Sequence, residues 1–330
     1  MALRVSTSRY VLFVAAALLV ALVMSTTLLA TSLDNSDIDG MGHIIITTLR
    51  QESDFVVEWI NYNRWIGFDH IVIYDQDDDQ TILPALLRAF IEKGVVTVVP
   101  WTLIGDQPGS ISHGLRTFGK LATSVTLMDG DEFLVLCEHI SVDQAYRAAG
   151  LFDTRHGCLQ ILWLPFGLSG AAHKPGPDTG ILETITQRAR LPFTGHAGKV
   201  VLRGGYSFLF TQVYGKPYNI PLWHKCDGRR EFNAKTLSPN VVRLNHYMFR
   251  YGLDSFEKRA TRGTSLNFKG QSMFKNKTIS ENMDAFPWLK NLTDDRHLTN
   301  VGVEFAGLLD AVPSSARKTS ATDCDRFVKM

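Results

Sequence analysis

The sequence predicts an α/β protein with a mostly parallel central sheet, preceded by an N-terminal transmembrane helix. After residue 42, short β-branched runs alternate with segments of helical apolar spacing, which is the pattern of βαβ units. The 330 residues are 45% hydrophobic and 20% charged, as expected of a chain that buries a large core. The net charge of +1 argues against a broad basic face that binds nucleic acid.

The N-terminal segment carries no charged residue from Tyr10 to Leu33. As a helix it is long enough to cross a bilayer. Arg4 and Arg9 precede it, so the positive-inside rule leaves the N-terminus in the cytoplasm and sends the rest across the membrane. We therefore expect a single-pass type II protein of the Golgi or another secretory-pathway membrane, with a lumenal body. A signal peptide cleaved near Ala30 is the alternative.

The predicted elements begin as strand, helix, strand, helix, strand. Ser53 and Asp54 offer an N-cap for the first helix, and Gly67 ends it. We expect strands at 43–48, 70–75, 95–99, 124–128, 158–164, 199–202 and 241–247, and helices ending near 66 and at 82–91, 141–149, 181–190 and 254–262. Right-handed βαβ units then form a doubly wound sheet that binds nucleotides at the carboxyl ends of its strands.

Two acids follow the fourth predicted strand, at the carboxyl edge of the sheet. Asp129 and Asp131 are spaced to present oxygen ligands to Mn²⁺ or Mg²⁺, which would clamp a nucleotide diphosphate. A solvated turn is the structural alternative. Because a carboxylate at a loop edge packs against little, we expect Asp131→Asn to leave stability nearly unchanged.

Three further residues are candidates for donor or metal binding. Asp75 ends the second strand, where an acid can accept from ribose hydroxyls or the base. His246, on a late strand, would complete the metal shell or contact the diphosphate, and Lys199 would meet phosphate oxygens. The alternatives are a turn-forming aspartate, a buried core histidine and a lysine on a solvated strand edge.

The segment between Trp163 and Gly180 is rich in Gly and Pro and suggests a mobile loop where a substrate could enter. Trp163 itself is expected in the core. Chemistry that activates a substrate hydroxyl needs a carboxylate base close to it. Glu183 and Asp178 flank this loop and are the candidates, with Glu183 preferred. An exposed acid that complements the helix dipole is the alternative for Glu183.

A series of short motifs occurs in a specific order along the chain. They are Arg50-Gln51-Glu52, Glu58-Trp59-Ile60, Gly67-Phe68-Asp69-His70, Asp129-Gly130-Asp131-Glu132-Phe133, Trp163-Leu164-Pro165-Phe166-Gly167, Asn245-His246-Tyr247 and Ser255-Phe256-Glu257-Lys258-Arg259. Together they resemble glycosyltransferase family 92 and the related family-2-like group, over roughly residues 42–263.

The resemblance implies a GT-A fold, a nucleotide-sugar donor and an Asp-x-Asp-bound divalent cation, usually Mn²⁺. It also implies inversion, a glycan or other hydroxyl acceptor, and a position for Arg50 and Glu52 near the base and ribose pocket. We expect a UDP-sugar as donor. The resulting organisation is a cytoplasmic tail (1–9), a signal anchor (10–33), a linker (34–42), a GT-A-like domain (43–311) and a poorly ordered tail (312–330).

Departures from the family pattern leave other functions open. The family usually has Arg-Asn-Glu where this chain has Arg50-Gln51-Glu52, and His where Asn63 stands. If these changes remove the donor pocket, the chain is a catalytically silent glycan-binding protein on the same fold. A phosphatase or nucleotidyltransferase is a third alternative, although the hydroxyl residue expected soon after a phospho-accepting Asp is lacking. The disulfide pairing of Cys137, Cys158, Cys226 and Cys324 stays open.

Overall fold

The computed structural model separates into two units, residues 1–40 and residues 41–330, and the elements below all belong to the second. The residues that the structure describes are 40–137, 141–153, 157–170, 173–176, 179–190, 198–205, 234–239, 241–255, 258, 286, 289 and 291–295. Among these, no helix has the length and apolar character that a bilayer crossing requires. The predicted anchor and the predicted tail from 312 both lie outside them.

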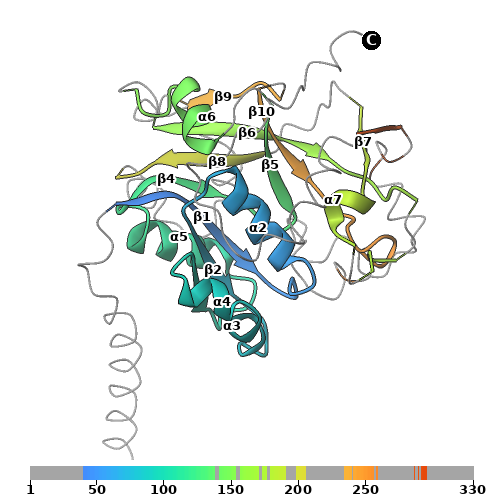
Figure 1. Cartoon of the computed structure of the whole chain (residues 1–330), viewed down its shortest axis with the longest axis horizontal. Helices are drawn as coiled ribbons and strands as arrows, with labels where there is room; N and C mark the ends of the chain where they lie inside the picture. Colours follow the sequence, from blue (N-terminus) through green and yellow to red (C-terminus); the bar gives the residue numbers. More distant parts are fainter. Residues whose placement is uncertain are drawn as a thin grey trace, which may run out of the picture. The chain divides into compact units, whose positions relative to one another are not determined.

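A large sheet forms the centre of the second unit, as Figure 1 shows. Within the described residues it has nine strands. Its order is β3-β2-β1-β4-β8-β6-β10-β5, with β9 paired to β6. The strands are β1 (Met41–Leu49), β2 (His70–Asp75), β3 (Val96–Pro100), β4 (Ala122–Leu127), β5 (Glu132–Leu136), β6 (Cys158–Pro165), β8 (Gly198–Arg203), β9 (Ala234–Thr236) and β10 (Val242–His246). The predicted α/β fold with a mostly parallel sheet is confirmed, since β3, β2, β1 and β4 are mutually parallel and β8 enters antiparallel between β4 and β6.

Both faces of the first four strands are covered, because alternate side chains of a strand point to opposite faces. Ile45 and Ile71 pack in the cluster that contains Trp59 of α2, whereas Ile44 and Val72 pack in a second cluster with Leu115 of α5. Both clusters are almost wholly excluded from solvent. Burial on both faces explains why these strands read as continuous β-branched runs.

The helices agree with the sequence only in part. They are α2 (Val56–Ile66), α3 (Ile82–Leu86), α4 (Arg88–Glu92), α5 (Gln107–Thr117), α6 (Val142–Ala148) and α7 (Ile181–Thr184). Gly67 ends α2 with φ of 108°, as predicted. The predicted N-cap is wrong, because α2 follows Phe55 without a side-chain cap, and Asp54 instead pairs with Lys174 at 3.0 Å.

The predicted helix over residues 181–190 is also wrong beyond its first turn. The chain leaves α7 at Thr184 and forms β7 (Gln187–Ala189), which pairs antiparallel with β11 (Leu292–Asp294). That partner strand is remote in sequence, so local spacing gives no sign of it. The predicted single helix over 82–91 is divided at Leu87, and of the predicted helix over 254–262 only Asp254, Ser255 and Lys258 are described.

Candidate functional site

The carboxyl ends of β1, β2 and β4 meet at one edge of the sheet. Leu49 at the end of β1 is in register with Asp75 at the end of β2, and Ile46 of β1 is in register with Leu127 of β4. The loops that follow these strands carry most of the predicted site residues. Parallel pairing therefore brings together segments that lie far apart in the sequence.

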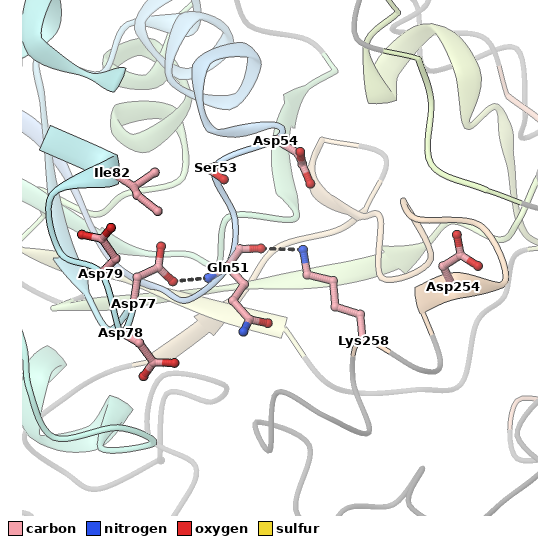
Figure 2. A pocket seen from close by; sticks show the side chains of 9 residues that line it. All are labelled: Gln51, Ser53, Asp54, Asp77, Asp78, Asp79, Ile82, Asp254 and Lys258. Atoms are coloured by element: carbon pink, nitrogen blue, oxygen red, sulfur yellow. Dashed lines mark hydrogen bonds between the residues drawn. The ribbon is translucent and has the colours of Figure 1, made fainter. Parts of the chain in front are cut away.

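A pocket of about 600 Å³ opens beside the loops that follow β1 and β2. Its lining is mostly acidic: Gln51, Ser53, Asp54, Asp77, Asp78, Asp79, Ile82, Asp254 and Lys258. Figure 2 shows Asp77 and Lys258 reaching the backbone of Gln51 from opposite sides. Carboxylates accept hydrogen bonds and repel anions, so the lining suits neutral hydroxyl and N–H donors better than phosphate.

Gln51 itself has a left-handed backbone, with φ of 56°. This conformation is uncommon for a side chain other than Gly, Asn or Asp. It is held from both sides, since the N–H of Gln51 donates to the Asp77 carboxylate and its carbonyl accepts from Lys258 Nζ at 2.5 Å. Burial lowers the pKa of Lys258 to about 8. The loop after β1 is thus fixed in a strained geometry at the pocket wall.

Asp75 lies beneath this pocket's acidic loop and is fully buried. Its Oδ1 accepts from the N–H of Asp77 at 2.9 Å, and its Oδ2 has no hydrogen-bond partner among the described residues. Burial raises the pKa of Asp75 to about 6. Asp75 is not among the residues that line the pocket, so a hydroxyl or N–H of a ligand would satisfy this spare acceptor only after a shift of the loop that follows β2.

On the other side of the edge, Asp129 is held by a buried cation. Its Oδ2 accepts from Lys199 Nζ at 2.6 Å, and its Oδ1 from Gln107 Nε2 at 2.9 Å. Burial lowers the pKa of Lys199, but the carboxylates of Asp129 and Glu132 outweigh it and raise the pKa overall. Glu132 is fully buried, and desolvation raises its pKa well above the ordinary range.

Asp131 is held in the same way by Arg250. Arg250 Nη1 lies 2.6 Å from Asp131 Oδ2, while Nη2 of the same guanidinium pairs with Glu52. All three side chains are buried. The expectation that Asp131 is a loop-edge carboxylate with little packing is therefore wrong, because the β5–β10 pairing closes over it.

His246 lies at the end of β10, opposite Glu132. Its Nε2 is 3.6 Å from Asp131 Oδ1, and its Nδ1 is buried without a hydrogen-bond partner in the described part of the chain. The ring packs 4.5 Å from that of Trp163. Trp163 therefore borders the site, with Lys199 Nζ 5.7 Å from its ring, and is only partly buried, contrary to the expected core role.

The donor set fits a divalent cation of the Mn²⁺ type. A carboxylate oxygen and an imidazole nitrogen 3.6 Å apart are too far for a hydrogen bond yet close enough to share one ion. The nitrogen that faces Asp131 is Nε2, and Nδ1 of the same ring points elsewhere. No cluster of three or more metal-ligating side chains occurs within the described ranges.

Of the two predicted catalytic carboxylates, Asp178 and Glu183, the structure describes only Glu183. Asp178 lies outside the described residues. Glu183 is on α7, whose first N–H groups, from Ile181 and Leu182, donate to the carboxylate of Glu58 on α2 at 2.8 and 3.2 Å. Burial raises the pKa of Glu58, and the nearby Glu183 adds to the shift. Glu58 thus anchors the segment that carries Glu183.

A second arrangement that looks catalytic lies at the opposite edge of the sheet. His43 Nδ1 is 2.8 Å from Ser124 Oγ, and His43 Nε2 is 3.2 Å from Asp143. A serine nucleophile must be reachable by its substrate. Ser124 is fully buried, so this triad joins β1, β4 and α6 and has no access for chemistry.

Sequence reasoning missed three residues that organise the site. Arg250 follows the motif Asn245-His246-Tyr247, and Lys258 lies within the last motif, where sequence reasoning assigns it no role. Both pair with the loop after β1, about 200 positions earlier in the chain. Gln107, at the start of α5, orients Asp129. An arginine within the aromatic run from Tyr247 to Tyr251 was the one available signal.

The fold and the edge site define a mixed α/β protein with a large, mostly parallel sheet and a cluster of acids at the carboxyl ends of its strands. Residues 46–149 match the family model described as glycosyltransferase family 92. A glycosyltransferase family 92 protein of Ricinus communis is 28% identical over 210 residues, which are 62% of this chain and 35% of that protein. One of Arabidopsis thaliana is 29% identical over 97 residues, 29% of this chain and 17% of that protein. The predicted resemblance to glycosyltransferase family 92 is confirmed by these matches.

The match covers only about a third of the length of the first of these relatives. Among solved structures, residues 1–349 of S. aureus TarS give a TM-score of 0.38 at 14% identity, covering 78% of this chain and 72% of that one. GalNAc-T7, solved with UDP, GalNAc and Mn²⁺, gives a TM-score of 0.37 at 11% identity, covering 62% of this chain and 43% of that one. At these scores the likeness is distant.

Proposed function

We propose that the protein is a glycosyltransferase that moves a sugar from a nucleotide-sugar donor to a glycan or other hydroxyl acceptor. The observation that carries this proposal is the pairing of two unlike subsites at one sheet edge, within and beside the region that matches the family. One is an acidic pocket with the spare acceptor of Asp75, and the other is the Asp129–Asp131 turn with Lys199 and Arg250.

The charges of the two subsites suggest which end of the nucleotide-sugar donor, nucleoside or diphosphate, each would bind. The acidic pocket would receive the nucleoside, whose ribose hydroxyls and base N–H groups are donors, with Asp75 as acceptor and Arg50 and Glu52 in the adjoining loop. The diphosphate would lie toward Lys199 and the acid turn. This division fits a nucleoside diphosphate sugar of any base, and the resemblance to glycosyltransferase family 92 leads us to propose a UDP-sugar.

A bound Mn²⁺ or Mg²⁺ would offset the charge that develops on the leaving diphosphate. Asp131 and His246 would hold it, with Asp129 beside them. The GT-A fold and an inverting outcome belong to the same proposal. Glu183, or Asp178, would accept the proton of the acceptor hydroxyl as the new glycosidic bond forms.

We further propose a lumenal location behind a type II anchor. The uncharged run from Tyr10 to Leu33 supports it. Cys137 and Cys158 are both disulfide-bonded, which fits an oxidising compartment. Protease added to sealed microsomes should leave the body of the chain intact. Complete digestion would contradict the topology, and a mature N-terminus near Leu33 would indicate a cleaved signal peptide instead.

The activity is tested by a donor-hydrolysis screen over UDP-, GDP- and CMP-sugars, with and without Mn²⁺. We expect Mn²⁺-stimulated release of UDP, lost in Asp131→Asn. Asp143→Asn is the matched control, because Asp143 lies at the opposite edge, paired with Arg147. If none of the donors is hydrolysed, the proposed enzymatic activity is wrong, and a catalytically silent glycan-binding protein is favoured.

A further inference from the structure

The turn that contains Asp129 and Asp131, called the acid turn below, is paired with cations of the protein itself. Each oxygen of Asp129 has a partner, Lys199 Nζ at 2.6 Å and Gln107 Nε2 at 2.9 Å. Asp131 Oδ2 is bound by Arg250, which leaves only Oδ1 toward His246. Lys199 and Arg250 are buried and come from β8 and the segment after β10. These cations are part of the folded core and are not mobile surface charges.

The charges nearly cancel. Asp129, Asp131 and Glu52 bring three negative charges, and Lys199 and Arg250 bring two positive ones. Glu132 is a fourth carboxyl group, 3.8 Å from Lys199 Nζ, but burial raises its pKa and so disfavours its charge. A dication that approached Asp131 would meet the ammonium and the guanidinium at short range. Even in the dielectric of bulk water, repulsion between a dication and an ammonium about 6 Å away weakens binding by about tenfold.

We propose that Lys199 and Arg250 prevent the acid turn from binding a divalent cation on its own, so that the metal is captured only together with a diphosphate. A diphosphate supplies the negative charge that the turn lacks and offers the two cations an alternative partner. The part of this inference that concerns the diphosphate rests on the proposed function. The expected weak binding of Mn²⁺ alone does not depend on it. Lys199 is thereby a positioning residue that sets the order of binding.

The test is a titration of the full chain with Mn²⁺, in the absence and in the presence of UDP. Calorimetry and electron paramagnetic resonance measure the Mn²⁺ that binds. The wild type should bind Mn²⁺ alone weakly, and UDP should tighten this binding at least tenfold. Lys199→Met frees an oxygen of Asp129, which is 32% exposed and can be hydrated. This variant should bind Mn²⁺ alone about tenfold more tightly than the wild type.

Lys93→Met is the charge-matched control, because Lys93 precedes β3 at the opposite edge of the sheet, and it should not change Mn²⁺ binding. If Lys199→Met does not fold, Lys199→Gln keeps an N–H donor for Asp129 and carries the same expectation. Tight Mn²⁺ binding by the wild type alone, or unchanged binding in the Lys199 variant, would overturn the proposal. A third outcome is that UDP does not change Mn²⁺ binding while Lys199→Met binds Mn²⁺ more tightly than the wild type. This outcome would overturn the proposed function and the binding of metal together with diphosphate. It would still support the role of Lys199 in weakening metal binding.

Discussion

Two groups of carboxylates share one edge of the sheet, and they differ in how their charge is met. The acids around the pocket, Asp77, Asp78 and Asp79, come from a single loop and face an open cavity. Those of the turn after β4, the partly exposed Asp129 and the buried Asp131, are paired with Lys199 and Arg250, which are buried and come from distant parts of the chain. The first group is solvated and adaptable, and the second is built into the core. The difference implies that the turn, more than the pocket, couples the site to the stability of the fold.

The largest expected effect is that of Arg250→Met. It leaves the buried carboxylates of Glu52 and Asp131 without their shared cation, which should cost about 3–5 kcal/mol in the free energy of unfolding. Arg147→Met removes an exposed, solvent-screened pair with Asp143 and should leave the free energy of unfolding nearly unchanged. Urea denaturation of both variants measures the contrast. Equal small effects would mean that the turn is no more coupled to the core than a surface pair.

Asp131→Asn should have an intermediate effect on stability. Arg250 keeps Glu52 as a partner but loses its charged bond to Asp131, at a cost of about 1–3 kcal/mol. The sequence alone predicts almost no cost. A melting temperature that matches the wild type in metal-free buffer would therefore restore the sequence-based prediction and contradict the buried pair.

Asp75→Asn should act on stability in the opposite direction and only at higher pH. The pKa of Asp75 is raised from 3.8 to about 6, so the folded state is penalised once the carboxyl ionises. Relative to the wild type, the variant should gain about 1–2 kcal/mol at pH 8, discounted for screening, and almost nothing at pH 4. Melting temperatures across this range measure the gain. A gain that does not depend on pH would contradict the assigned cause.

The smallest effect is expected at Gln51. Because its φ is 56°, Gln51→Gly should relieve strain and stabilise the fold by up to about 1 kcal/mol. Gln144→Gly, within α6, should instead destabilise by about 1 kcal/mol. Chemical denaturation of the two variants compares the same substitution in two backbone conformations. Changes of the same sign would argue against a strained loop at the pocket wall.

Much of the fold could be predicted because β1 and β2 are buried on both faces and leave unbroken apolar, largely β-branched runs. The positions of Asp75, Asp129 and Asp131 at one edge follow from parallel pairing alone. The partners of Asp129 and Asp131 could not be predicted, since Lys199 and Arg250 reach them through pairings with no local signature. The bond from Lys258 to the carbonyl of Gln51 has no local signature either. The pairing of β7 with β11 escaped prediction for the same reason.

The division of the site into a nucleoside pocket and a diphosphate-binding turn is tested most directly by comparing uridine and UDP as ligands. Calorimetry in Mn²⁺ should show that Asp75→Asn weakens both, because both place a nucleoside in the pocket. Asp131→Asn should weaken UDP at least tenfold and leave uridine unchanged, because only UDP reaches the turn. Equal UDP affinity in the wild type and Asp131→Asn, or loss of uridine binding in Asp131→Asn, would contradict the account.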